Sequence, residues 1–133
     1  MRKQGYEPLP ERVERLATVV VDAAYQVHTA LGPGLLESIY ETCLCHELAC
    51  RKVSFRRQVS VPVVYRDIRL DSGLRLDLLV DEELVVEIKA VEDHLPLYEA
   101  QLLSYLKLVD VRLGLLINFN VELIKHGIRR VIR

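Results

Sequence analysis

The chain has 133 residues, of which 50% are hydrophobic and 28% are charged. This length suits a single domain over residues 1–133, and the apolar share excludes a disordered chain. Eighteen Lys and Arg residues against 19 Asp and Glu residues leave a net charge of −1. Overall charge therefore gives no indication of a nucleic-acid partner, and such a contact would need a local patch.

The sequence contains no segment that is typical of membrane insertion or secretion. No apolar run approaches the roughly 18–20 residues of a membrane span, and Met1–Pro10 is polar, so we expect no membrane partner. Residues 1–10 are predicted to be flexible or loosely packed. Cys43, Cys45 and Cys50 are odd in number, which favours reduced thiols in the cytoplasm over disulfides. Buried thiols acting as small hydrophobic groups are favoured over a metal or cluster site.

Two helices are predicted in the first part of the chain. Apolar residues recur every three or four positions from Glu11 to Leu31, which is the period of a helix with one buried stripe. Gly32-Pro33-Gly34 ends this helix, because proline cannot continue the hydrogen-bond ladder and glycine tolerates a positive φ. A second helix is predicted over about Leu35–Lys52.

The hydrophobic period then changes to two, which is typical of strands. Phe55–Tyr65 is predicted to be a half-exposed strand, in which Pro62 favours a sheet edge or a bulge. Tyr65-Arg66-Asp67 is a turn candidate. Leu74–Val80 and Leu84–Ile88 are predicted to form an antiparallel hairpin closed by a tight turn.

The last third of the chain predicts a helix between strands. Pro96 marks the start of a helix over Leu97–Val109. The apolar run Leu113–Ile117 favours a buried strand that a helical crossover makes parallel to a neighbour, and Ile128–Arg133 a final strand. The order α-α-β-β-β-α-β-(β) predicts an α/β fold with a mixed sheet.

The predicted hairpin carries two acidic residues that face each other. Alternation places Asp77 on the face opposite Leu76 and Leu78, and a turn formed by residues 81–83 sets Asp77 directly across from Glu87. Such residues have Cβ atoms about 4.5–5.5 Å apart. Two carboxylates this close repel each other, and the repulsion grows with burial. A divalent cation removes the conflict, and hard oxygen ligands suit Mg²⁺ or Mn²⁺.

Lys89 projects from the same strand face as Glu87. Its ammonium group could orient or help deprotonate a water, or neutralise charge developing on a phosphate. Asp77 with Glu87-x-Lys89 therefore predicts a hydrolytic metal site. The alternative is that Glu87 and Lys89 are a chance pair on a solvated strand face, which would contribute well under about 1 kcal/mol to stability. A turn of two residues instead of three would shift the register, and Asp77 would then no longer lie opposite Glu87.

Four further polar residues have both a functional and a structural interpretation. Glu37 shares a helix face with Tyr40, where a partly buried carboxylate needs a partner, although a glutamate in a first turn also interacts favourably with the helix dipole. Gln101 and Tyr105 are neighbours on one helix face or an ordinary polar rim. His28 is interpreted as a hydrogen-bonded structural residue in preference to a ligand.

The segment Gly34-Leu-Leu-Glu37-Ser-Ile-Tyr40 resembles the signature of the GxxExxY proteins, which belong to the PD-(D/E)XK nuclease superfamily. The resemblance covers nearly the whole chain, and its further segments are residues 28–37, 55–65, 77–90, 99–105 and 114–120. It implies a restriction-endonuclease-like core with a mixed central sheet flanked by helices. One departure is visible, since Leu76 stands where the superfamily pattern has proline.

The resemblance also assigns roles to the polar residues. Asp77 and Glu87 would be the metal ligands and Lys89 the catalytic lysine. Apart from the resemblance, we expect the Ile88 backbone carbonyl to be a further ligand. Glu37 would match a helix-borne glutamate of the RecB-like branch that supports the ion directly or through water. Gln101 and Tyr105 would match the Q-x-x-x-Y helix motif of the same branch. As further catalytic residues, they would contact the substrate phosphate or fix the position of the lysine.

We therefore expect a nuclease that uses Mg²⁺ or Mn²⁺ and acts on DNA in preference to RNA. Contacts to phosphates would come from basic residues, and the candidates are Arg51, Lys52, Arg56, Arg57, Arg75, Arg129, Arg130 and Arg133. The alternative function is a catalytically inactive module of the same fold that binds nucleic acid or a protein partner, as a homodimer. A purely structural dimer through the edge of Phe55–Tyr65 is a third interpretation.

Overall fold

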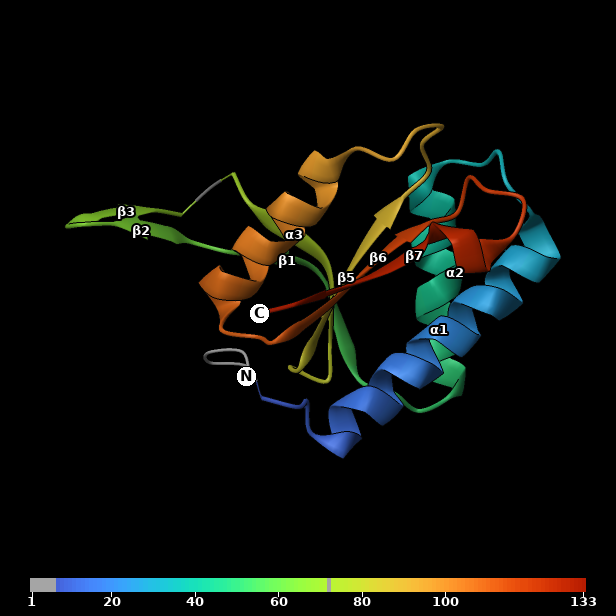
Figure 1. Cartoon of the computed structure of the whole chain (residues 1–133), viewed down its shortest axis with the longest axis horizontal. Coiled ribbons are helices and arrows are strands. Elements are labelled where there is room, and N and C mark those ends of the chain that lie inside the picture. The colour runs from blue at the N-terminus through green and yellow to red at the C-terminus, as the bar shows by residue number, and fades with distance from the viewer. Residues whose placement is uncertain (1–6, 72) are drawn as a thin grey trace, which may run out of the picture.

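Helices cover both faces of a central sheet in the computed structural model, which describes residues 7–71 and 73–133 (Figure 1). Helices α1 (Glu11–Leu31) and α2 (Glu37–Cys50) lie on one face, and α3 (Pro96–Val109) lies on the other. This arrangement is the mixed α/β fold, with a central sheet flanked by helices, that the sequence predicted.

The sheet has the strand order β1-β4-β5-β6-β7. β5 runs parallel to β6, and the pairs β1–β4, β4–β5 and β6–β7 are antiparallel, so the expected hairpin, parallel strand and final strand are all present. A short 3₁₀ helix, η1, precedes the last strand. The bounds of these elements are β1 Phe55–Ser60, β4 Arg75–Val80, β5 Leu84–Lys89, β6 Leu113–Asn118, η1 Ile124–Gly127 and β7 Ile128–Ile132.

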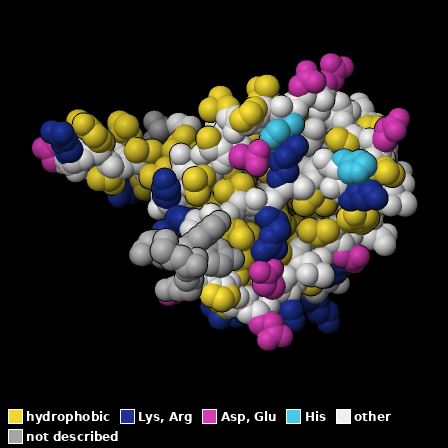
Figure 2. All heavy atoms as spheres, in the orientation of Figure 1, with side chains coloured by type: hydrophobic (Ala, Val, Ile, Leu, Met, Phe, Trp, Pro, Cys, Tyr) yellow, Lys and Arg dark blue, Asp and Glu magenta, His cyan; other side chains and the backbone are white. Residues whose placement is uncertain are grey.

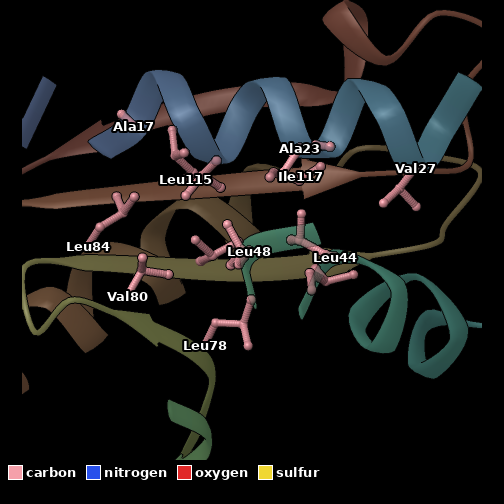
Figure 3. Packing of buried hydrophobic residues seen from close by; sticks show 14 of the residues in the cluster. Ala17, Ala23, Val27, Leu44, Leu48, Leu78, Val80, Leu84, Leu115 and Ile117 are labelled. Carbon is pink, nitrogen blue, oxygen red and sulfur yellow. The ribbon is translucent and has the colours of Figure 1, made fainter. Parts of the chain in front are cut away.

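Two apolar clusters fix the sheet between its helices. On the α1–α2 side, leucine and alanine side chains of the helices interdigitate with strand residues (Figure 3). Each large aliphatic side chain buried here contributes roughly 1.5–3 kcal/mol. On the α3 side, Leu102 and Leu106 pack against Leu79, Val85 and Leu116. Odd-numbered residues of β5 therefore face α3, and even-numbered residues face α1 and α2.

The corner between the first two helices depends on glycine. Gly32 and Gly34 have φ values of 66° and 101°, which confirms the expected break after Leu31. The second helix is shorter than predicted. It begins at Glu37 because Leu36 is extended, and it ends at Cys50, close before Lys52 with its positive φ of 60°.

The prediction of one continuous strand over Phe55–Tyr65 is wrong. β1 ends at Ser60, and Val61 turns its side chain into the core on the α3 side. Pro62 has no N–H with which to continue the ladder, so the chain leaves the sheet there. β1 nevertheless lies at the sheet edge that Pro62 indicated.

The chain that leaves the sheet forms a separate hairpin, which the sequence did not predict. β2 (Val63–Tyr65) pairs with β3 (Ile68–Leu70) across the expected turn. This hairpin projects from the body of the molecule, and its hydrophobic side chains lie on the surface (Figure 2). Val64, Tyr65, Ile68 and Leu70 are all more than half exposed.

The cysteines are free thiols, but only Cys45 is buried, whereas Cys43 is half-buried and Cys50 is exposed. Residues 1–6 lie outside the described residues, and Leu9 packs against the larger apolar cluster. Within residues 7–71 and 73–133, no helix has the length and hydropathy needed to cross a membrane.

Candidate active site

The two acidic residues of the β4–β5 hairpin meet where the strands separate. The ladder pairs Val80 with Leu84 and continues as far as Leu78 with Val86, so Asp77 and Glu87 come next, as expected from the turn. Beyond Leu78 and Val86, carboxylate oxygens take the place of backbone carbonyls as acceptors for the N–H groups of the two strands. The Asp77 N–H donates to Glu87 Oε2 at 2.7 Å, and the Ile88 N–H donates to Asp77 Oδ2 at 2.8 Å. The structure thus brings both carboxylates into one gap between the strands.

A twist of β4 accompanies this gap, and here one expectation is wrong. Leu76 and Leu78 were predicted to share the face opposite Asp77. Instead, Leu76 packs in the cluster under α3, whereas Leu78 packs under α1 and α2. The strand therefore rotates at Asp77 so that its side chain enters the gap.

Glu87 is in an environment that disfavours its charge. Its side chain is 8% exposed. Burial and, to a smaller extent, the negative charge of Asp77 raise the pKa of Glu87 to about 8, although the hydrogen bond from the Asp77 N–H and the ammonium group of Lys89 oppose the shift. A proton or a cation is needed to neutralise this pair.

The backbone carbonyl of Ile88 points into the same gap. The Phe119 N–H donates to the Lys89 carbonyl at 2.9 Å, so the Lys89 carbonyl faces β6. Successive carbonyls along a strand point in opposite directions, so that of Ile88 faces β4. The Ile88 N–H, which bonds to Asp77, points the same way.

These oxygen atoms fit a hard divalent cation. Mg²⁺ is usually held by one or two carboxylates and keeps several waters, so two acids and a carbonyl supply enough ligands. In the described part of the chain, no group of three or more His, Cys, Asp and Glu side chains has the closeness of a metal cluster.

Lys89 and Glu37 flank the acids. The Lys89 Nζ lies 4.6 Å from the centre of the Tyr98 ring, which is a cation–π contact. Glu37, at the start of α2, is exposed to solvent, although its carboxyl group is partly desolvated. Partial desolvation raises the pKa of Glu37, the charge of Lys89 lowers it, and the charge of Asp77 raises it. Glu37 therefore lies within electrostatic range of the site.

The two residues of α3 differ in their relation to the acids. Tyr105 is buried, and burial raises its pKa, followed by the negative charges of Glu87 and Asp77. Gln101 is exposed in an open groove on the outside of α3 that Tyr105 also lines. His28 is structural, as favoured, since its Nε2 lies 2.7 Å from the Val121 carbonyl oxygen.

Comparison with known protein families identifies the fold. A family model described as the PD-(D/E)XK nuclease superfamily matches residues 14–131. The chain belongs to this superfamily. Comparisons with curated proteins and with solved structures gave no significant match. The match to the PD-(D/E)XK superfamily spans every residue that forms the gap and its surroundings.

A second layer around the PD-(D/E)XK site was missed by sequence reasoning. Gln58 Nε2 donates to Asp77 Oδ1 at 3.3 Å and to Glu41 Oε1 at 2.9 Å, and Arg57 forms an ion pair with the buried Glu41. Gln58 has a φ of 50°, which is uncommon for a residue with a side chain. Pairing β1 with β4 places Gln58 opposite Asp77, and this pairing was the signal that could have identified it. The alternating pattern of β1 alone predicted that Gln58 lies on the exposed face.

Most of the basic residues that were candidates for phosphate contacts are engaged elsewhere. Five of them form ion pairs with acidic side chains, namely Arg51, Arg56, Arg57, Arg130 and Arg133. Among the described residues, Lys52, Arg75 and Arg129 form no ion pair. Of these three, only Arg129 lines a cleft beside Lys89.

Proposed function

We propose that the chain is a metal-dependent nuclease that hydrolyses phosphodiester bonds of DNA, and less readily those of RNA, with Mg²⁺ or Mn²⁺. The observation that carries this proposal is the facing pair Asp77 and Glu87, which is buried in a sheet gap and held by backbone N–H groups. Membership of the PD-(D/E)XK nuclease superfamily supports the reaction class. Residues 1–133 would act as a single domain.

The ion would be held by the carboxylates of Asp77 and Glu87 and by the Ile88 carbonyl. When bound, it supplies positive charge to the phosphate that is attacked. Glu37 would assist from α2, since it shares the electrostatic environment of Asp77 and Lys89. The hydrogen bond from Gln58 orients Asp77.

Lys89 is the proposed group that orients the attacking water. Its ammonium group is held over Tyr98 and lies within electrostatic range of Glu87 and Glu37. From there it would orient the attacking water and neutralise charge on the phosphate. Tyr105 lies near the acids and would fix the lysine or contact the phosphate, with Gln101 at the outer rim.

Three finer assignments belong to the same proposal. We place the chain among the GxxExxY proteins of the RecB-like branch on the basis of Gly34, Glu37 and Tyr40 and of the Gln101–Tyr105 pair. A cytoplasmic location rests on the free thiols of its cysteines. Homodimer formation rests on the exposed apolar residues of the β2–β3 hairpin, because isolated two-stranded hairpins are marginal in water. Ile68→Lys should then shift the sedimentation coefficient to that of a monomer.

The hairpin also favours the second candidate function, an inactive module that binds a partner. The two functions differ in their response to Lys89. We expect purified protein with Mg²⁺ or Mn²⁺ to cleave DNA or RNA, and Lys89→Ala to abolish cleavage while the circular dichroism spectrum stays unchanged. Lys107→Ala, an exposed lysine on α3, is the matched control and should keep the activity. Equal trace activity in wild type and Lys89→Ala would indicate contamination and refute the nuclease proposal.

A further inference from the structure

A small cleft adjoins the candidate active site on the side away from Asp77. It has a volume of about 100 Å³ and lies between the end of β5, the start of α3 and η1. The polar side chains that line it include Lys89, Glu92, Tyr98, Asn118, His126 and Arg129. In Figure 2, histidine and Lys or Arg side chains gather over the end of β5 and over η1.

Arg129 is aligned with the active site across the sheet. The pairing of β5 with β6 joins Glu87 to Leu116, and the pairing of β6 with β7 joins Leu116 to Arg129. These three residues therefore form one row on the face that packs under α3. Two strand spacings of about 4.8 Å separate the backbone of Glu87 from that of Arg129.

The backbone around Arg129 is fixed by a close approach of two segments. A Cβ atom at Gly127 would lie 2.1 Å from the Asn118 carbonyl oxygen, so only glycine fits there. Asn118 is itself fixed, because its amide group donates to the Val91 carbonyl at 3.0 Å and accepts from the Val91 and Asn120 N–H groups at 3.1 Å. The cleft wall is thus preformed.

The charge of the cleft is positive. Lys89 and Arg129 form no ion pair among the described residues, and His126 adds a further nitrogen donor. Glu92 is exposed and is the one carboxylate among the cleft's described lining residues. The neighbouring Arg130 contrasts with Arg129, since it bonds to Glu14 on α1 at 2.9 Å on the opposite face of β7.

We propose that this cleft binds one phosphate of a nucleic-acid strand, adjacent to the phosphate that is cleaved. The inference rests on the proposed function and adds a substrate class, namely strands that continue beyond the cleaved bond. The Arg129 guanidinium group suits phosphate because its planar N–H groups match two oxygens. A volume of about 100 Å³ equals that of roughly three water molecules. The cleft is therefore large enough for one phosphate group.

The test compares Arg129→Gln with Arg130→Gln, since both remove one charge from adjacent residues of β7 and only the first removes it from the cleft. A fluorescently labelled single-stranded DNA oligonucleotide is titrated in EDTA, so that no metal-dependent cleavage occurs. We expect Arg129→Gln to weaken binding about tenfold and to lower the slope of log K against log salt by about 0.7, the value for one phosphate contact on a single strand. Arg130→Gln should change neither.

The outcomes separate this inference from the nuclease proposal. Equal effects of the two substitutions, or no binding by the wild-type protein, would overturn the phosphate site even if Mg²⁺-dependent cleavage is observed. A selective effect of Arg129→Gln supports the site, and it does so even if no metal gives cleavage, in which case only the nuclease proposal fails. Unchanged melting temperatures of both variants confirm that they fold.

Discussion

Replacing Glu87 with glutamine should stabilise the metal-free protein, and the gain should grow with pH. Glutamine keeps an oxygen that accepts the Asp77 N–H but has no charge to bury. The folded-state pKa of Glu87 is about 8, against an ordinary value of 4.5. A raised pKa means that the folded state binds the proton more tightly, so this residue's contribution to stability is lost as pH rises from the lower value to the higher one.

The size of the effect follows from the same two pKa values. Each pH unit between them corresponds to about 1.4 kcal/mol. A pH of about 7.5 lies about three units above the ordinary pKa of 4.5. At this pH, Glu87→Gln should therefore raise the free energy of unfolding by about 4 kcal/mol. At about pH 5 the same substitution should change it by less than about 1 kcal/mol.

Urea denaturation in EDTA, repeated over this pH range, measures the difference directly. Glu122→Gln changes an exposed glutamate in the same way and should show no comparable trend with pH. A constant difference between Glu87→Gln and wild type would refute the reasoning. It would mean that the facing carboxylates are relieved of their repulsion without a proton or a metal ion.

Two further substitutions test the surroundings of the site. Gln58→Ala removes the amide that links Asp77 to Glu41. Loss of such a partner of a metal ligand commonly weakens metal binding, so isothermal titration calorimetry should show an affinity for Mn²⁺ that is about tenfold lower. An unchanged affinity would contradict this role of Gln58. Gly114→Ala places a Cβ atom 2.9 Å from the Leu102 side chain and should destabilise the fold by about 1–3 kcal/mol in thermal or urea unfolding, and an unaltered midpoint would show that α3 yields freely.

The facing of Asp77 and Glu87 could be predicted because it depends only on local quantities. Strand alternation has a fixed period, and the length of the turn at residues 81–83 sets the register. The structure has Val80 paired with Leu84, so the count along both strands holds up to the gap. The helix bounds were predictable to within two residues, because they depend on the local hydrophobic period and on the proline and glycine residues at the helix ends.

The features that were missed depend on contacts between segments distant in the sequence. β1 leaves the sheet where Pro62 ends the ladder, but no local pattern reveals that Val61 takes a core position under α3. Gln58 has a positive φ, and its bonds join β1 to α2 and β4. No pattern in the sequence favoured Arg129 among the eight basic candidates. Only the order of the strands shows that Arg129 lies in line with Glu87 across the sheet.

Binding of Mn²⁺ tests the central claim most directly. Isothermal titration of the wild-type protein should give saturable binding, and Asp77→Asn should abolish it. Asp93→Asn, which changes an exposed aspartate in the loop before α3, should leave the binding intact. Absence of binding by the wild-type protein, or equal binding by Asp77→Asn, would contradict the assignment of the buried acidic pair as the metal ligands.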